Sequence, residues 1–161
     1  MSGLPSNAGL GFTICRRINA PPAEVFRIFT ELDRAAERIP AISRVEILTG
    51  GGVGQGTRFR ETRRLRGREV QAELEITRFE QDQGYVVQCE GPDCTFSSGF
   101  LMWPDGDGTK VEVALDCEPK GLLARMRVRL LLRAMKKEFE RDFLALKAAA
   151  EEARAASERS S

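Results

Sequence analysis

The sequence predicts an α+β domain in which one antiparallel sheet packs against a single long helix at its C-terminal end. Apolar residues recur with a period of two in one segment near the N-terminus and in six further segments between residues 42 and 117. Short turns separate most of these segments, and strands joined by short turns pair antiparallel. After Gly121 the apolar period becomes helical and continues to about residue 156.

The first strand is predicted over residues 12–18, where apolar side chains alternate with polar or charged ones. Asn19 and the prolines after it end this strand. Asn19 is also a candidate N-terminal cap for a helix that includes residues 25–32. A second short helix is expected over residues 34–38, because the residue before Pro40 disfavours helical geometry.

The remaining strands are predicted at 42–48, 57–65, 69–79, 85–90, 95–103 and 109–117. The first two are separated by a glycine-rich segment, Thr49–Thr57. A phosphate-binding loop needs a helix N-terminus after its glycines, whereas a strand follows here and no Gly-Lys-Ser/Thr is present. The segment is therefore interpreted as a strand connection and not as a nucleotide site.

The long helix has an apolar stripe that is predicted to face the sheet. The stripe contains Val128, Leu132, Met135, Phe139, Phe143 and Leu146. A second apolar edge contains Leu123, Met126, Leu130 and Ala134. This edge is expected to be covered by the short helices, by a loop or by a partner chain. From Lys147 onward alanine and charged residues dominate, and this part is expected to fray or project into solvent.

Composition excludes several classes of function. The chain has 161 residues, enough for one domain, with a net charge of +1 and no histidine. A near-neutral balance argues against a dedicated nucleic-acid binder, and the lack of histidine excludes histidine-based catalysis and metal binding. The four cysteines form no CxxC pair, so neither a metal nor another cofactor is expected. No secretory or membrane-spanning segment is recognised, which favours a cytoplasmic protein with reduced thiols.

Polar residues on faces that otherwise point inward indicate a ligand cavity between sheet and helix. Glu61 and Arg63 alternate with Phe59 and Leu65, and burying either charge is costly unless it is paired or hydrated. Aromatic and sulfur-containing residues share the inward faces, a lining that suits an apolar ligand. The candidate ligand-binding residues are Phe59, Glu61, Arg63, Val87, Cys89, Phe96, Ser98, Phe100, Met102, Val113, Leu115, Cys117, Met135 and Phe139.

The segment 14–26, ICRRINAPPAEVF, resembles the opening of the SRPBCC superfamily, with a strand ending in I-x-A-P and a helix beginning P-x-E-V-F/W. Shorter matches follow in the expected order at 37–40, 56–59, 67–68, 108–111 and 146–147. The resemblance covers residues 12–150. It implies a helix-grip fold, a seven-stranded antiparallel curved sheet around a long C-terminal helix, with two short helices after the first strand. We expect the domain over 11–150, a flexible tail over 1–10 and a fraying helix end over 151–161.

The resemblance also implies a class of function. Relatives include polyketide cyclase/dehydrase-like proteins, START lipid-transfer domains, pollen-allergen-like proteins, coenzyme Q-binding proteins and ring-hydroxylase catalytic domains. The last group needs a metal centre built with histidines, which this chain lacks. The leading expectation is binding, transport or sequestration of a small hydrophobic, aromatic or lipid-like molecule. A glycine-rich loop borders the cavity mouth in related folds, so Gly51, Gly52 and Gly54 are expected to form a mobile gate.

Two further functions stay open. In the first, the protein is a polyketide cyclase or dehydratase that uses Glu61 as acid or base, although Glu61 could equally be a rim carboxylate paired with Arg63. In the second, the start of the long helix binds a partner chain or makes a homodimer, and the chain is otherwise a monomer.

The cysteines and the basic stretches also allow two interpretations each. Cys89 and Cys117 are either reactive thiols or small buried hydrophobes, and Cys94 is expected to be the exposed cysteine. The basic residues of the long helix and of strand 57–65 are either a surface for anionic lipid or RNA, or a solvated face balanced by Glu138, Glu140 and Asp142.

Overall fold

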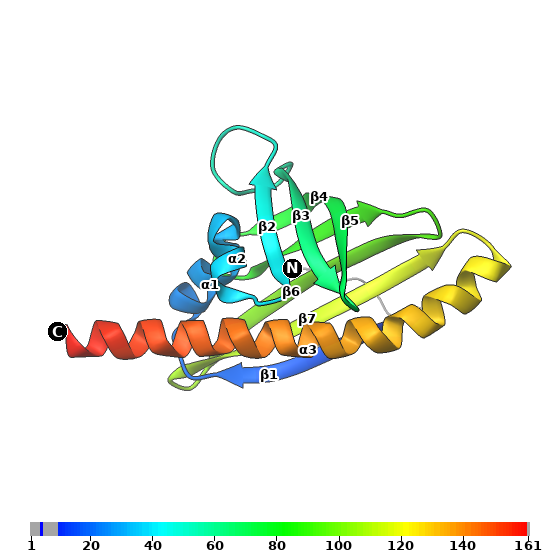
Figure 1. Ribbon diagram of the computed structural model, residues 1–161. Helices are drawn as coiled ribbons and strands as arrows, with labels where there is room; N and C mark the ends of the chain where they lie inside the picture. The colour runs from blue at the N-terminus through cyan, green and yellow to red at the C-terminus, as the bar shows by residue number, and fades with distance from the viewer. Residues whose placement is uncertain (1–3, 5–9, 161) are drawn as a thin grey trace.

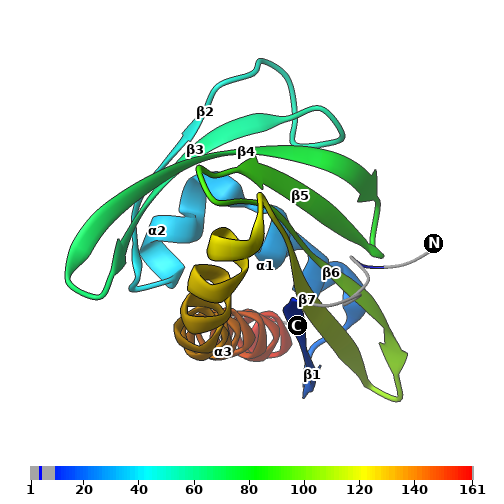
Figure 2. The same cartoon turned by 90° about the vertical axis from the view of Figure 1, so that its right-hand side faces the viewer.

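The described residues form one curved antiparallel sheet with a long helix running along its concave side (Figures 1 and 2). The structure is a computed structural model that describes residue 4 and residues 10–160. The strands are β1 Gly11–Ile18, β2 Ile42–Ile47, β3 Arg58–Leu65, β4 Arg68–Glu80, β5 Gly84–Glu90, β6 Cys94–Asp105 and β7 Gly108–Pro119. The helices are α1 Pro22–Thr30, the 3₁₀ turn η1 Leu32–Arg34, α2 Ala35–Arg38 and α3 Leu122–Arg159. The predicted helix-grip architecture is confirmed.

The sheet order is β1-β7-β6-β5-β4-β3-β2, so strands β2 to β7 form a meander and β1 joins its far edge. The sequence requires β1 to pair within the sheet but does not identify its partner, which is β7 with Ile14 opposite Val113. Strands β5 and β6 approach closely at Gly99, where a Cβ atom would lie 2.4 Å from the carbonyl oxygen of Tyr85. Only glycine permits this close approach of the two strands.

Helix α3 packs through its predicted stripe against the edge of the sheet and against α1. Val128 is 1% exposed and Phe143 3% exposed, so both are fully part of the core. The Phe139 ring meets Phe12 of β1 edge-on with centroids 5.4 Å apart, and Phe143 meets Phe29 of α1 at 6.0 Å. These contacts hold α3 against β1 and α1.

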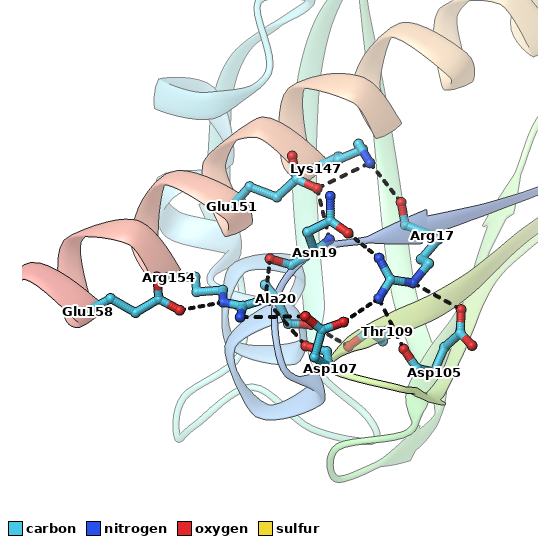
Figure 3. Close-up of polar contacts among 10 residues, drawn as sticks. All are labelled: Arg17, Asn19, Ala20, Asp105, Asp107, Thr109, Lys147, Glu151, Arg154 and Glu158. Atoms are coloured by element: carbon cyan, nitrogen blue, oxygen red, sulfur yellow. Dashed lines mark hydrogen bonds and ion pairs between the residues drawn. The ribbon is translucent and has the colours of Figure 1, made fainter.

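The C-terminal part of α3 is helical up to Arg159, and fraying of the helix end over 151–161 stays a prediction. Arg154 Nη1 donates hydrogen bonds to the carbonyl oxygens of Asn19, at 3.1 Å, and of Asp107, at 3.3 Å (Figure 3). These two acceptors belong to the β1–α1 connection and the β6–β7 turn. A polar helix face that looked solvated in sequence therefore ties three elements together.

The same region corrects the expected role of Asn19. Pro21 occupies the cap position of α1, and no side chain caps that helix. The backbone N–H of Asn19 instead donates to Glu151 Oε1 at 2.8 Å (Figure 3). Ala150 is fully buried beside this contact, because a small side chain allows α3 to approach closely.

The expected flexible tail, residues 1–10, falls mostly outside the described residues. Leu10 is described and is buried at 7% exposure, and its carbonyl oxygen accepts a hydrogen bond from the Cys117 backbone N–H at 2.8 Å. Ordered packing therefore begins at least at Leu10. Across residue 4 and residues 10–160, none of the helices has the length and apolar character to cross a lipid bilayer.

Candidate functional site

A cavity of about 360 Å³ lies between the concave face of the sheet, α3 and the short helices. Strands β2 to β7 contribute to its wall, while β1 does not. Its volume is at the lower end of the range for small-molecule sites, and its lining is mostly aliphatic and aromatic. All of the predicted ligand-binding residues line this cavity except Met102 and Cys117. Ligand binding by these residues stays a prediction.

Met102 and Cys117 lie on the inward faces of their strands, as the alternation indicates, but other elements cover them. Met102 is 4% exposed and packs in the core cluster that contains Val25 and Phe26 of α1. Cys117 is 4% exposed and packs in the cluster that contains Val128 of α3. The strand alternation therefore identified the inward face of the sheet correctly, whereas the helices decided how much of that face stays open to the cavity.

The cavity wall also includes residues that the sequence analysis does not assign to it. They include Ile28, Phe29, Leu32, Ala35 and Ile39 from the short helices and their connections, and Val70, Ala72 and Leu74 from β4. The strand alternation places the three β4 residues on one face, so this signal was present in the sequence. No sequence signal shows that the short helices close one side of the cavity.

Three charged side chains form a chain of ion pairs within the cavity wall. Arg63 Nε donates to Glu61 Oε1 at 2.6 Å, and Arg63 Nη2 donates to Asp142 Oδ2 at 2.8 Å. The side chains of Arg63, Glu61 and Asp142 are 20%, 19% and 14% exposed. The expected pairing of Glu61 with Arg63 is present, and the second carboxylate comes from the opposite side of the cavity on α3. We call these three residues the charged triad.

Burial and charge act in opposite directions on the groups of the triad. Burial raises the pKa of Asp142, and the attraction of Arg63 only partly offsets that effect. For Arg63, burial lowers the pKa, but the attraction of Glu61 and Asp142 outweighs it and the net pKa is raised. The guanidinium therefore stays charged, while Asp142 accepts a proton more readily than an exposed aspartate does.

The assignment of Asp142 to a solvated helix face is wrong. It lies three residues after Phe139 and four before Leu146, and both of these residues also line the cavity. Residues three and four apart share one face of a helix, so this spacing was available in the sequence. What the sequence could not show is that Arg63, 79 positions away in the chain, lies opposite.

Tyr85 contributes a phenol to the same cavity. Its ring meets Phe100 edge-on with centroids 4.7 Å apart. Burial raises the pKa of the Tyr85 hydroxyl, and the nearby Glu61 carboxylate raises it further. The structure therefore places Tyr85 on the cavity wall as a neutral hydroxyl.

We expect Tyr85 to titrate well above the value of about 10 for an unperturbed tyrosine. Because it is the only tyrosine in the chain, the absorbance of tyrosinate reports it alone. The raised pKa contributes stability that is complete below the unfolded value and is lost as pH rises towards the folded pKa. Glu61→Gln should lower the folded pKa part of the way. Native protein that titrates like its urea-denatured form would contradict this prediction.

The glycine-rich connection between β2 and β3 lies apart from this cavity. None of Gly51, Gly52 and Gly54 is on its wall, and Figure 1 shows the connection as the loop beyond the end of β2. Val53 instead lines a second, more polar pocket of about 220 Å³ that also includes Arg27 of α1. A role for the glycines as a gate of the larger cavity stays a prediction.

The cysteines favour a packing role over a reactive one. Cys94 is 2% exposed, so the expectation that it is the exposed cysteine is wrong. Burial raises the pKa of the Cys117 thiol to about 12 and also raises the pKa of the half-buried Cys89. A raised pKa keeps a thiol protonated and therefore poorly nucleophilic. In the part of the chain that the structure describes, no group of three His, Cys, Asp or Glu side chains could hold a metal ion.

Comparison with protein families gives one match over most of the chain. The family model described as "Polyketide cyclase / dehydrase and lipid transport" matches residues 11–151. A search of curated proteins finds no match.

Solved structures with the same fold come from proteins with different descriptions. An aromatase/cyclase from Streptomyces sp. R1128 has a TM-score of 0.75 at 18% identity, covering 88% of this chain and 93% of that one. A START superfamily protein from Mycobacterium smegmatis has a TM-score of 0.73 at 16% identity, covering 89% and 99%. The protein Ara h 8.0201 has a TM-score of 0.70 at 21% identity, covering 87% and 96%. At these identities the likeness shows the shared fold alone.

Proposed function

We propose that this chain, which belongs to the polyketide cyclase/dehydrase and lipid transport family, binds a small and largely apolar molecule in its cavity. The observation that supports this most is a partly open apolar cavity with one group of charged side chains in its wall. Burying a ligand's apolar surface contributes roughly 25 cal/mol per Å² before the costs of ordering are subtracted. The polar groups would then fix the ligand's orientation.

The charged triad favours particular polar groups on the ligand. It contains two carboxyl groups and one guanidinium, so its net charge is negative or zero. A ligand carboxylate would meet Glu61 and Asp142 and gain no net attraction from the triad. A hydroxyl or phenol can instead donate to either carboxyl group, and Tyr85 and Ser98 lie on the same wall. We therefore propose an apolar ligand with hydroxyl groups, such as a phenolic ring system or a lipid alcohol.

Native mass spectrometry and thermal stability in the presence of matched ligand pairs test this proposal. Polycyclic phenols and long-chain alcohols should bind and raise the melting temperature, while the corresponding carboxylic acids should bind at least about tenfold more weakly. Ser98→Trp should fill the cavity and prevent binding. Ser97→Trp is the control, because Ser97 lies next to it on the other face of β6 and does not line the cavity. A bare protein mass with no stabilisation by any member of the panel would contradict the proposal.

A second candidate function is a cyclase or dehydratase that acts on a β-ketone chain. One observation favours it: Asp142, whose pKa is raised, lies across Arg63 from Glu61, so two carboxyl groups face one apolar cavity. A positioned acid or base contributes typically about 10²–10⁴-fold to a rate. Glu61→Gln and Asp142→Asn should then reduce turnover while the ligand still binds. Unchanged turnover of an identified substrate in both variants would exclude these roles.

A further inference from the structure

An exposed apolar stripe lies on the first turns of α3. Leu122, Leu123, Met126 and Leu130 are 79%, 71%, 66% and 68% exposed. The apolar spacing predicts that the short helices, a loop or a partner chain cover this edge. Within the described residues nothing covers it. Contiguous large apolar side chains on a protein surface mark a contact with another molecule or with a membrane.

Cations surround this stripe. Between Leu122 and Glu138 the helix contains no carboxylate, and its cations are Arg125, Arg127, Arg129, Arg133, Lys136 and Lys137. Arg127 pairs with Asp93, and the other five make no ion pair with any described residue. An exposed helix face with apolar side chains between unpaired cations matches the pattern of helices that lie in a membrane interface.

The tip of the β3–β4 hairpin adds to the same pattern. Arg64, Arg66 and Arg68 are exposed there and form no ion pair with a described residue. Val70, at 42% exposure, is the most exposed residue of the cavity wall, so the cavity opens beside this tip. Leu131 of α3 lies on the wall opposite. In Figure 2 the hairpin tip lies to one side of the first half of α3.

We propose that the first half of α3 and the β3–β4 tip form a docking face for an anionic lipid membrane. The apolar stripe would enter the interface, and the unpaired cations would contact the anionic headgroups. Each cation near the membrane surface strengthens the attraction to anionic lipid, and burial of the apolar side chains strengthens binding further. The mouth of the cavity, beside Val70, would then be held close to the membrane surface.

The charges favour a membrane over a second copy of the chain. A twofold dimer through this face would place the same surface on both sides of the contact. Arg125, Arg129 and Arg133 would then face cations of the partner, with no carboxylate before Glu138 on either helix. Anionic phospholipids neutralise these charges, whereas a second copy opposes them.

Sedimentation with vesicles tests the docking face without any cavity ligand. The unmodified protein should bind vesicles of equimolar phosphatidylcholine and phosphatidylserine, should not bind vesicles of phosphatidylcholine alone, and should dissociate at high salt. Leu123→Glu combined with Met126→Glu should weaken binding at least about tenfold. Arg129→Gln combined with Arg133→Gln should weaken it about 25-fold, from about fivefold for each charge.

Leu144→Glu is the matched control. Leu144 is 58% exposed on the same side of α3, about 27 Å further along the helix than Met126, which exceeds the Debye length at physiological salt. Binding by this variant should stay within about twofold of the unmodified protein. All of the substituted residues are exposed, and far-ultraviolet circular dichroism checks that the variants fold.

Several outcomes would overturn the proposal. The first is that the unmodified protein does not bind the anionic vesicles. The second is that the Leu123/Met126 and Leu144 substitutions weaken binding equally. The third is that the protein does not bind vesicles but forms a concentration-dependent dimer in light scattering, which Leu123→Glu and Met126→Glu abolish. Because no cavity ligand is used, failure here leaves the proposed ligand binding intact, and failure of ligand binding leaves this proposal intact.

Discussion

Replacing Arg63 by alanine is expected to lower the free energy of unfolding by about 3 kcal/mol at neutral pH. The substitution leaves Glu61 and Asp142 without the cation that pairs with both of them. Removing one partner of a buried ion pair costs about 3–5 kcal/mol, and the lower end applies because these side chains keep 14% to 20% of their surface exposed. Urea denaturation of the variant and the parent protein measures the difference.

The loss should depend on pH in a defined direction. Burial already raises the pKa of Asp142 in the folded protein, and without Arg63 nothing offsets that effect. An aspartate whose folded pKa lies above its unfolded value of about 3.9 destabilises the fold increasingly as pH rises from that value through the folded pKa. The Arg63→Ala variant should therefore recover stability relative to the parent as pH falls from neutral to mildly acidic.

Arg58→Ala is the control for this prediction. Arg58 lies on the same strand and pairs with Glu73, but its side chain is 54% exposed. An exposed pair contributes at most about 1 kcal/mol, so this variant should lose little stability. Equal losses in the Arg63 and Arg58 variants would show that the charged triad behaves as an ordinary surface pair.

Phe100→Ala is expected to lower the free energy of unfolding by about 3–5 kcal/mol. Phe100 is 4% exposed, and its ring centroid lies 5.0 Å from Phe29 and 4.7 Å from Tyr85. The substitution removes these aromatic contacts and enlarges the cavity towards α1, because Phe100 also lines the cavity. A large ligand that the parent protein excludes should then bind.

Trp103→Ala on the same strand is the control for Phe100. Trp103 is 38% exposed, and its ring contacts Lys110 Nζ at 5.7 Å. Loss of an exposed cation–π contact costs less than about 1 kcal/mol. If the two variants lost similar stability in urea denaturation, the aromatic cluster would not be part of the structural core.

Much of the cavity wall could be predicted from local patterns. Strand alternation identified Phe59, Ser98 and Phe100 as inward-facing, and helical spacing did the same for Met135 and Phe139. The same rules missed Asp142, although its spacing from Phe139 was equally regular. A charged residue was assigned to solvent because charge usually indicates exposure, and only its partner Arg63 makes its burial acceptable.

The contacts near the end of α3 were missed for a related reason. Alanine and charged residues after Lys147 match a solvated helix, yet Arg154 and Glu151 bind backbone groups of the β1–α1 connection and the β6–β7 turn. Hydrogen-bonding partners on other elements cannot be read from the helix's own sequence. At the start of α3 the short helices and the described loops leave the apolar edge exposed, and cover by a partner chain stays a prediction.

The sequence by itself determined the strands, their turns, the long helix and the inward-facing side of the strands, because these depend on neighbours two to four residues apart. Only the tertiary structure decided that β1 pairs with β7, that a cavity stays open and that Arg63 joins Glu61 to Asp142. Those features depend on the curvature of the sheet and on where α3 lies along it, which together bring distant residues within hydrogen-bonding distance.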